Sequence, residues 1–169
     1  MDPMKAVVIT ISDRVSRGAA EDRSGPAAVR MLELLGFATE QAVVEDGVEP
    51  VATVLRDWVA RGVDLVVTTG GTGFGPRDLT PEATALVIDR PAPGLAEAMR
   101  SATFGVNPHG MLSRAIAGIA GSTLVVNLPG SEAGVEESLA VVGPSLPHAV
   151  ELLSARPSDH IRGRREPSG

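Results

Sequence analysis

The sequence predicts an α/β protein in three layers, with a parallel sheet between helices. Short apolar runs rich in β-branched residues alternate along the chain with segments of helical periodicity. That β-α-β-α-β order requires parallel strands joined by helices that cover the faces of the sheet. The length of 169 residues and the 43% of hydrophobic residues suit one domain with a substantial core.

Four runs are predicted to be strands, mostly buried ones. Each is bounded by polar residues or glycine, as expected for the strands of a covered parallel sheet. They span residues 5–11, 39–45, 63–69 and 122–128.

Helices are predicted between and after these strands. Ala28, Met31, Leu32 and Leu35 recur at the spacing of one helix face, and Gly36 supplies a stop signal. A second stripe runs over residues 51–59, and further helices are expected at 80–89, 93–104 and 131–155, the last interrupted near 143–144. We therefore expect one domain over residues 1–155. The last fourteen residues, 156–169, have almost no apolar content and are predicted to be a disordered tail.

Composition excludes several functions. The net charge of −6 argues against general nucleic-acid binding, and the absence of Cys excludes thiolate metal sites and disulfides. The only lysine is Lys5, so mechanisms that need a mid-chain phosphate-binding or Schiff-base lysine are disfavoured. No run of 18 apolar residues and no signal-peptide pattern is present, which predicts a cytoplasmic protein with no membrane partner.

Small and acidic residues follow every predicted strand. Because ligands of parallel sheets bind beyond the carboxyl ends of the strands, these residues are expected to form one site. They are Ser12 and Asp13 after the first strand, Asp46 after the second, Gly70, Gly71, Thr72 and Gly73 leading to Arg77 and Asp78 after the third, and Pro129, Gly130 and Ser131 after the fourth.

The stretch "TTGGTGFGPRDLTPEAT", residues 68–84, is the richest of these segments. It has no Gly-Lys-Ser/Thr of a Walker A loop and lacks the third glycine of a dinucleotide fingerprint. Its glycines allow backbone N–H groups to approach an anion closely. Thr80 is predicted to cap a helix that begins with Pro81 and Glu82, a reading that needs no catalytic role for them. Ser131 is predicted to stand at another helix start, which suits a phosphate or a carboxylate.

Three carboxylates, Asp13, Asp46 and Asp78, converge on the predicted site. They can bind Mg²⁺, which takes a few carboxylates together with substrate phosphates. The alternative is that each caps a turn or a helix end. Arg77 and Arg114 can pair with phosphate, although a surface role is the ordinary one for arginine. The residues thus predict an acidic, phosphate-binding cleft without a covalent nucleophile, and they do not name the substrate.

The chain resembles the Mog/MoaB family of molybdenum-cofactor biosynthesis proteins, which includes the gephyrin G domain. The resemblance covers residues 5–154 and rests on "ISDR", "EDRSGP", "TTGGTGFGPRDLTPEAT", "MLSR", "NLPGS" and "LPHAVELL" in that order. It implies a mixed sheet of the molybdopterin-binding fold, a homotrimer, and contacts with other cofactor-synthesis proteins. It also implies an adenylyltransferase that uses Mg²⁺ and ATP to transfer AMP to the terminal phosphate of molybdopterin, releasing pyrophosphate.

The resemblance also implies roles for individual residues. Asp46 and Asp78 match the acidic positions needed for activity and for the metal. Gly70 to Gly73 match the nucleotide and phosphate loop, which Glu82 orders beside Thr80. The remaining pterin and nucleotide surface is implied for Ser12, Asp13, Ser113, Arg114, Pro129, Gly130 and Ser131.

Two residues of the chain differ from the family pattern. Gly75 stands where alanine is usual, and Glu45 stands where several relatives have proline.

Two functions other than adenylyl transfer stay open. The chain can instead be a MoaB-like module that binds pterin or a protein without turnover. A hydrolase of the related nucleotide-amidase and pyrophosphatase type is the third hypothesis, which the long "LSR…NLPGS" match disfavours.

Overall fold

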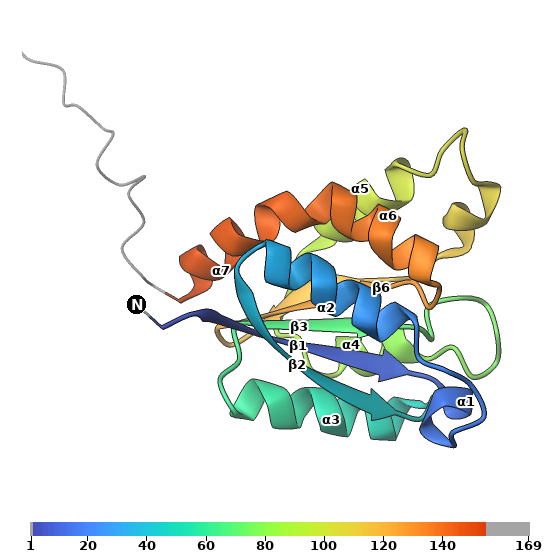
Figure 1. The fold of residues 1–169 in the computed structure, drawn as a ribbon, viewed down its shortest axis with the longest axis horizontal. Helices are drawn as coiled ribbons and strands as arrows, with labels where there is room; N and C mark the ends of the chain where they lie inside the picture. Colours follow the sequence, from blue (N-terminus) through green and yellow to red (C-terminus); the bar gives the residue numbers. More distant parts are fainter. Residues whose placement is uncertain (1, 155–169) are drawn as a thin grey trace, which may run out of the picture.

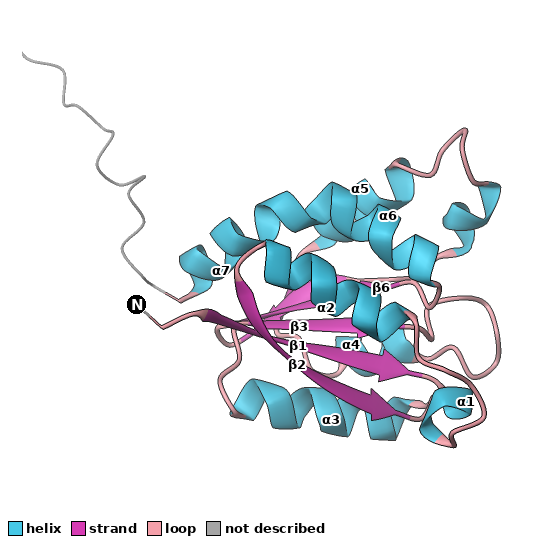
Figure 2. Ribbon diagram, in the orientation of Figure 1, coloured by secondary structure: helices cyan, strands magenta, loops and turns pink. Residues whose placement is uncertain are grey.

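The computed structural model describes residues 2–154, and the predicted tail at 156–169 lies outside these described residues. Six strands form one sheet, and helices cover both of its faces (Figures 1 and 2). The strands are β1 (Met4–Ile11), β2 (Phe37–Val44), β3 (Leu65–Thr69), β4 (Arg90–Pro91), β5 (Ala117–Ala120) and β6 (Thr123–Leu128). The α-helices are α1 (Asp13–Ser16), α2 (Ser24–Leu34), α3 (Val48–Ala60), α4 (Thr80–Ala85), α5 (Pro93–Ser101), α6 (Glu132–Val142) and α7 (Leu146–Leu153), with 3₁₀ turns η1 (Pro108–Leu112) and η2 (Gly143–Ser145).

The sheet is mixed, with the strand order β2-β1-β3-β6-β5-β4. The four strands expected from the sequence pair in parallel, while β5 and β4 add an antiparallel edge. The three-layer αβα prediction is confirmed. Strand β2 differs from its prediction as a mostly buried strand, because it lies at the edge of the sheet and its side chains are largely exposed or half-buried.

Two apolar clusters hold the layers together. One side of the sheet packs against α2, α5, α6 and α7 through residues such as Leu32, Leu139 and Leu146. The other side packs against α3 and α4 through Leu55, Trp58 and neighbouring residues. The helical stripes predicted at 28–35 and 51–59 supply these contacts. In the described part of the chain, no helix is long and apolar enough to cross a membrane.

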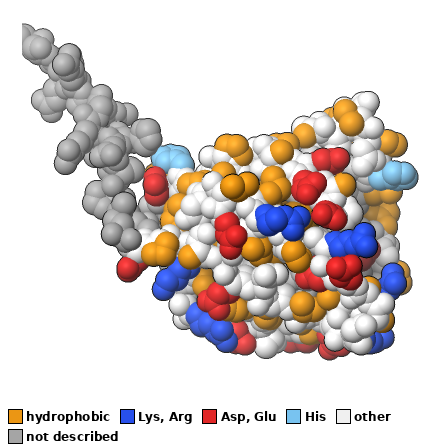
Figure 3. Space-filling model, viewed as in Figure 1, with side chains coloured by type: hydrophobic (Ala, Val, Ile, Leu, Met, Phe, Trp, Pro, Cys, Tyr) orange, Lys and Arg blue, Asp and Glu red, His pale blue; other side chains and the backbone are white. Residues whose placement is uncertain are grey.

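Helix ends differ modestly from the sequence prediction. The helices expected at 80–89 and 93–104 end at Ala85 and Ser101, and the 131–155 segment divides into α6 and α7 around η2, close to the predicted interruption. The chain after α4 turns instead into the edge strand β4. On the face drawn in Figure 3, acidic and basic side chains are intermixed rather than gathered by sign.

A buried asparagine fixes the end of β6. The Asn127 side chain donates to the hydroxyls of Thr68 (3.0 Å) and Thr84 (2.9 Å), and it accepts a hydrogen bond from the Ile116 N–H (3.2 Å). Because a buried amide is costly unless paired, these bonds join β6 to β3, to α4 and to the chain entering β5. The turns that follow β3 and β6 are therefore held side by side.

Candidate active site

A cavity of about 540 Å³ opens at the carboxyl edge of the parallel strands. Figure 1 shows the arrows of β1, β2 and β3 pointing to this end, where α1 and the loop after β3 lie. Residues predicted from all four strand ends line the cavity, as the shared edge of a parallel sheet requires. They are Ser12, Asp46, Gly70, Gly71, Asp78, Gly130 and Ser131.

The other predicted site residues do not line this cavity. They form the structure behind it or beside it, and their roles in ligand binding stay predictions. They are Asp13, Thr72, Gly73, Thr80, Glu82, Ser113, Arg114 and Pro129.

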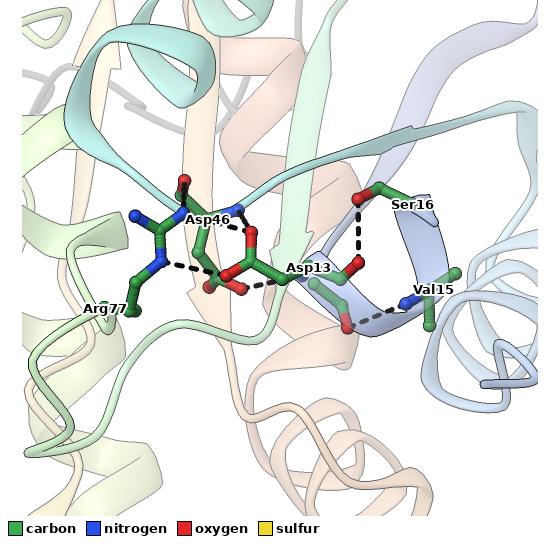
Figure 4. A network of polar contacts seen from close by, with 6 residues as sticks. Asp13, Val15, Ser16, Asp46 and Arg77 are labelled. Carbon is green, nitrogen blue, oxygen red and sulfur yellow. Dashed lines mark hydrogen bonds and ion pairs between the residues drawn. The ribbon is translucent and has the colours of Figure 1, made fainter. Parts of the chain in front are cut away.

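Asp13, Asp46 and Arg77 join the loops after β1, β2 and β3 (Figure 4). The Asp13 N–H donates to the Asp46 carboxylate (2.8 Å), and the Asp46 N–H donates back to the Asp13 carboxylate (3.1 Å). The Arg77 guanidinium donates to both Asp13 carboxylate oxygens (2.8 and 3.0 Å) and to the Asp46 carbonyl (2.8 Å). Arg77 is thus engaged by protein groups, and its pKa is raised by the Asp13 carboxylate.

The two paired carboxyls have opposite electrostatic environments. The hydrogen bond from Arg77 lowers the pKa of Asp13. Burial raises the pKa of Asp46, and the negative charges of Asp13 and Asp78 add to that rise. Asp46 therefore carries its charge at a cost, and a cation bound beside it would relieve that cost.

The first two glycines after β3 are required by close backbone contacts. A Cβ at Gly70 (φ +96°) would lie 2.4 Å from the Ile11 carbonyl oxygen, and one at Gly71 (φ +66°) would lie 2.2 Å from the Thr80 hydroxyl. On the other side, a Cβ at Gly130 would lie 3.2 Å from the Gly70 Cα. The turns after β3 and β6 can approach each other only because they carry no side chains.

Thr80 has a different role from the predicted helix cap. Helix α4 begins at Thr80 itself, and Leu79 occupies the N-cap position without a side-chain hydrogen bond. The buried Thr80 hydroxyl donates instead to the Gly70 carbonyl (2.9 Å), and the Thr80 N–H donates to the Gly71 carbonyl (3.0 Å). Thr80 therefore fastens the start of α4 to the glycine turn.

Arg114 holds the loop between β3 and α4 from behind. Its backbone N–H donates to the Thr72 carbonyl (2.8 Å), and its guanidinium donates to the Gly73 carbonyl (2.8 Å) and to the Asp78 carbonyl. The same guanidinium pairs with Glu82, which lowers the pKa of the glutamate. Arg114 thus joins the loop to Glu82 on α4, and the role that the resemblance implies for Glu82 stays a prediction.

Asp78 reaches the cavity from the far end of that loop. Its carboxylate accepts a hydrogen bond from the Gly75 N–H (2.9 Å) and lies close to both neighbouring glycines. A Cβ at Gly73 would lie 2.9 Å from this carboxylate, and a Cβ at Gly75 would lie 2.8 Å from it. The alanine that is usual at position 75 would therefore require the Asp78 carboxylate to move.

The predicted helix start at Ser131 is confirmed. Ser131 is the N-cap of α6, and its hydroxyl accepts a hydrogen bond from the Gly134 N–H (3.0 Å). Acidic Glu132 follows in the first turn and pairs with Arg30. The Gly130–Ser131 turn lines the cavity at the end of β6, and Asp46 lines it at the end of β2, with β1 and β3 between these two strands.

Sequence analysis missed the wall formed by the start of α2. Thr10 donates to the Asp22 carboxylate (2.7 Å), which also accepts from the Gly25 N–H (2.9 Å). The hydroxyls of Ser24 and Thr69 share a hydrogen bond (2.8 Å) across to β3. All of these residues except Gly25 line the cavity. The signal was present in "EDRSGP", where Asp three residues before Gly25 can accept its N–H.

The donor set suits a hard cation shared with a phosphate ligand. No cluster of three or more metal-binding side chains exists within residues 2–154. Asp46 and Asp78 nevertheless line one cavity, and Mg²⁺ is often held by one or two carboxylates while substrate phosphates and water complete its shell. The residues therefore fit Mg²⁺ as part of a complex with its substrate.

Fold and cavity together define an α/β domain with an acidic, glycine-lined cavity at the ends of its parallel strands. Residues 7–148 match the family model described as a probable molybdopterin binding domain, and the chain belongs to this family of molybdenum-cofactor biosynthesis proteins.

Relatives and solved structures agree with this assignment. The chain is 40% identical over 165 residues to gephyrin of Dictyostelium discoideum, covering 91% of this chain and 23% of that protein. It is 40% identical to a molybdopterin adenylyltransferase of Helicobacter pylori, covering 86% of this chain and 85% of that one. The Mog protein structure from Mycobacterium ulcerans has a TM-score of 0.84 at 44% identity, covering 88% and 98% of the two chains. The chain thus spans about a quarter of the gephyrin but most of the Helicobacter pylori and Mycobacterium ulcerans proteins.

Proposed function

We propose that this protein is a molybdopterin adenylyltransferase that uses Mg²⁺ and ATP. The observation that carries the proposal is the meeting of Asp46 and Asp78 with two glycine-lined turns, Gly70–Gly71 and Gly130–Ser131, around one cavity. Relatives that match over 71–85% of their own length are named molybdopterin adenylyltransferase. We also propose the homotrimer, the contacts with other cofactor-synthesis proteins and the cytoplasmic location that the family resemblance implied.

The reaction needs no nucleophile from the protein. An oxygen of the terminal phosphate of molybdopterin attacks the α-phosphorus of ATP, the bond from that phosphorus to the bridging oxygen breaks, and pyrophosphate leaves. The protein must then position two anionic substrates and offset their charge. Mg²⁺ supplies neutralisation of the phosphate charge when it is bound, and Asp46 and Asp78 are the residues that would hold it.

The remaining residues of the site serve positioning. The Gly71 backbone N–H and the first N–H groups of α6 can donate to phosphate oxygens, whereas the Gly70 N–H already donates to the Leu128 carbonyl (3.1 Å). Arg77 and Arg114 hold loops rather than pointing freely into the cavity, because their guanidinium groups already bind carboxylates and carbonyls. Because neither of these two guanidinium groups is free to bind phosphate, the metal ion would neutralise more of the phosphate charge.

Pyrophosphate release tests the proposal. Wild type is expected to release pyrophosphate from Mg-ATP only when molybdopterin is present. Asp78→Asn should reduce this rate by about 100-fold or more, the scale of losing one preorganised electrostatic group. Asn retains an oxygen that can accept the Gly75 N–H, so the loop contact need not be lost.

Asp57→Asn is the matched control, because Asp57 is an exposed residue on α3 away from the cavity. It should leave the rate unchanged. Tight molybdopterin binding by wild type without any pyrophosphate release would overturn the enzyme and leave a binding module.

A further inference from the structure

The carboxylate of Asp78 lies against the backbone of its own loop. Its Oδ2 accepts a hydrogen bond from the Gly75 N–H (2.9 Å), and the Asp78 N–H donates to the Gly75 carbonyl (3.0 Å). A Cβ on Gly73 would lie 2.9 Å from the same Oδ2, and a Cβ on Gly75 would lie 2.8 Å from it. The oxygen therefore occupies a space that exists only because both residues lack a side chain.

Backbone contacts fix the segment that carries this carboxylate. Gly75 and Asp78 are the first and last residues of a four-residue turn, and Pro76 stands at its second position, which proline favours. The Arg77 guanidinium is bound to the loop after β2, and the Asp78 carbonyl accepts a hydrogen bond from Arg114. A Cβ at position 75 would therefore displace the side chain of Asp78 rather than its backbone.

The backbone at position 75 can accept alanine. Gly75 is exposed and is not among the glycines with positive φ. It precedes Pro76, and a residue before proline favours the extended conformation that alanine also adopts. Alanine is moreover the usual residue here in the family. The fold thus does not require this glycine, and its effect is confined to the space beside Asp78.

The hydrogen bond from Gly75 engages an oxygen that a cation can use. Asp78 lines the cavity together with Asp46. Burial raises the pKa of Asp46, and the charge of Asp78 adds to that rise, so the two carboxylates act on each other. A cation that binds Asp78 has to share Oδ2 with the N–H donor or displace it, and hydrogen bonds to a charged acceptor are among the stronger ones.

We propose that Gly75 is a positioning residue that weakens cation binding in this chain, because it lets the Asp78 carboxylate fold back onto the Gly75 N–H and a divalent cation must compete with that hydrogen bond. With alanine at position 75, the carboxylate moves away from this donor and Oδ2 becomes available to the cation. The inference rests on the proposed function, in which Asp78 holds Mg²⁺.

A titration with Mg²⁺ alone, followed by NMR of the backbone amides, tests the proposal. Gly75→Ala is compared with wild type. Gly94→Ala is the matched control, since Gly94 is exposed, lies outside the cavity and has no atom within 4 Å of a Cβ placed there. Asp78→Asn and its combination with Gly75→Ala complete a double-mutant cycle. Thermal unfolding shows that each variant is folded.

We expect the Mg²⁺ Kd of Gly75→Ala to be about threefold to tenfold lower than that of wild type, the scale of one net hydrogen bond. Gly94→Ala should keep the wild-type Kd, and Gly75→Ala should change the Kd far less when Asp78→Asn is also present. In wild type, Mg²⁺ should shift the Gly75 amide proton upfield, because its acceptor is drawn away. A purely structural role of Gly75 would not produce this shift.

Four outcomes would overturn the proposal. They are equal Kd values for wild type and Gly75→Ala, a higher Kd for Gly75→Ala, a Gly75 amide proton that Mg²⁺ does not move, and no binding of Mg²⁺ by wild type at millimolar concentration. A higher Kd would show that the hydrogen bond presents the carboxylate to the cation.

The titration uses no nucleotide, pterin or turnover, so its result is separate from that of the pyrophosphate assay. The expected Kd values without any pyrophosphate release would refute the proposed reaction and leave the role of Gly75 standing. Pyrophosphate release together with equal Kd values would refute the role of Gly75 alone.

Discussion

Asp13 and Asp46 each donate the backbone N–H to the carboxylate of the other, yet the two carboxylates have different surroundings. Arg77 binds Asp13 at both carboxylate oxygens and lowers its pKa, so Asp13 is committed to holding the loops. Asp46 lines the cavity, and burial raises its pKa. A carboxylate whose charge is disfavoured by its surroundings is a candidate functional group. The structure therefore separates a positioning aspartate from one available to a ligand.

These opposite shifts predict opposite effects of substitution on stability. The folded-state pKa of Asp46 is raised, so its contribution favours folding below the unfolded pKa and is lost as pH rises through the folded pKa. At neutral pH the charged Asp46 is destabilising, and Asp46→Asn should raise the Tm. Because solvent screens this half-buried group, we expect a rise of about 2 °C or less. Thermal unfolding of the apo protein between pH 7 and pH 3 measures it, and the difference should shrink toward the acidic end.

Asp13→Asn provides the contrasting control in the same series. The pKa of Asp13 is lowered, so its contribution is present above the unfolded pKa and is lost as pH falls through the folded pKa. Asp13→Asn should therefore lower the Tm at neutral pH, with an effect that fades in acid. A lowered Tm for both variants at pH 7 would show that Asp46 is a structural residue like Asp13.

Residues of the site were predictable where the chain itself places them at a strand end. Asp46, Asp78 and the glycines follow predicted strands, and parallel pairing brings such positions together. Asp22 and Ser24 were missed because their partners, Thr10 and Thr69, lie on other elements. Thr80 was assigned as a helix cap because Thr-Pro-Glu fits a local pattern, whereas the turn at Gly70 supplies a tertiary acceptor. Local patterns do not reveal which distant group competes for a hydroxyl.

At the scale of elements, the loop from β3 to α4 is fixed at both ends. Thr80 binds its first carbonyls, and Arg114 binds carbonyls along it. The loop therefore has little freedom to adopt another path, and the position of Asp78 depends on this bracing. Its first glycine, Gly70, lies against backbone, because the Ile11 carbonyl oxygen at the end of β1 would be 2.4 Å from a Cβ there.

Substitution of alanine for each of two glycines with positive φ should separate the cost of the backbone dihedral from the cost of a steric collision. Gly121→Ala meets no atom within 4 Å at φ +61°, and should cost about 1–2 kcal/mol through the unfavourable dihedral alone. Gly70→Ala adds a collision with the Ile11 carbonyl and should cost about 3 kcal/mol or more in the free energy of unfolding. Urea denaturation of both variants measures the difference. Equal losses would mean that the glycine turn can move away from β1.

Sequence periodicity located the four parallel strands and the helices that cover them. The antiparallel strands β4 and β5 were missed, because "RP" and "AGIA" are too short and too weakly β-branched to show a strand pattern. They form through pairing with β6 and with each other. Their position is thus set by tertiary contacts rather than by local preference.

At the scale of the molecule, residues 2–154 contain the cavity at the strand ends and the two apolar clusters that hold the layers together. We propose that residues 1–155 form the functional domain. A chain that ends at Ala155 should keep its Tm within about 2 °C and retain pyrophosphate release at the wild-type rate. Thermal unfolding and the release assay on the shortened chain test this. A large loss of activity with an unchanged Tm would assign residues 156–169 to the reaction or to the assembly.

The contacts among Asp13, Asp46 and Arg77 span 31 to 64 positions of the chain. Closing such long loops costs chain entropy before any contact repays it, so non-local contacts of this kind slow folding. We expect these three loops to lock only after β1, β2 and β3 have paired. A newly synthesised chain would then be unable to bind its substrates until β1, β2 and β3 have paired. Substrate binding would therefore distinguish folded molecules from partly folded ones.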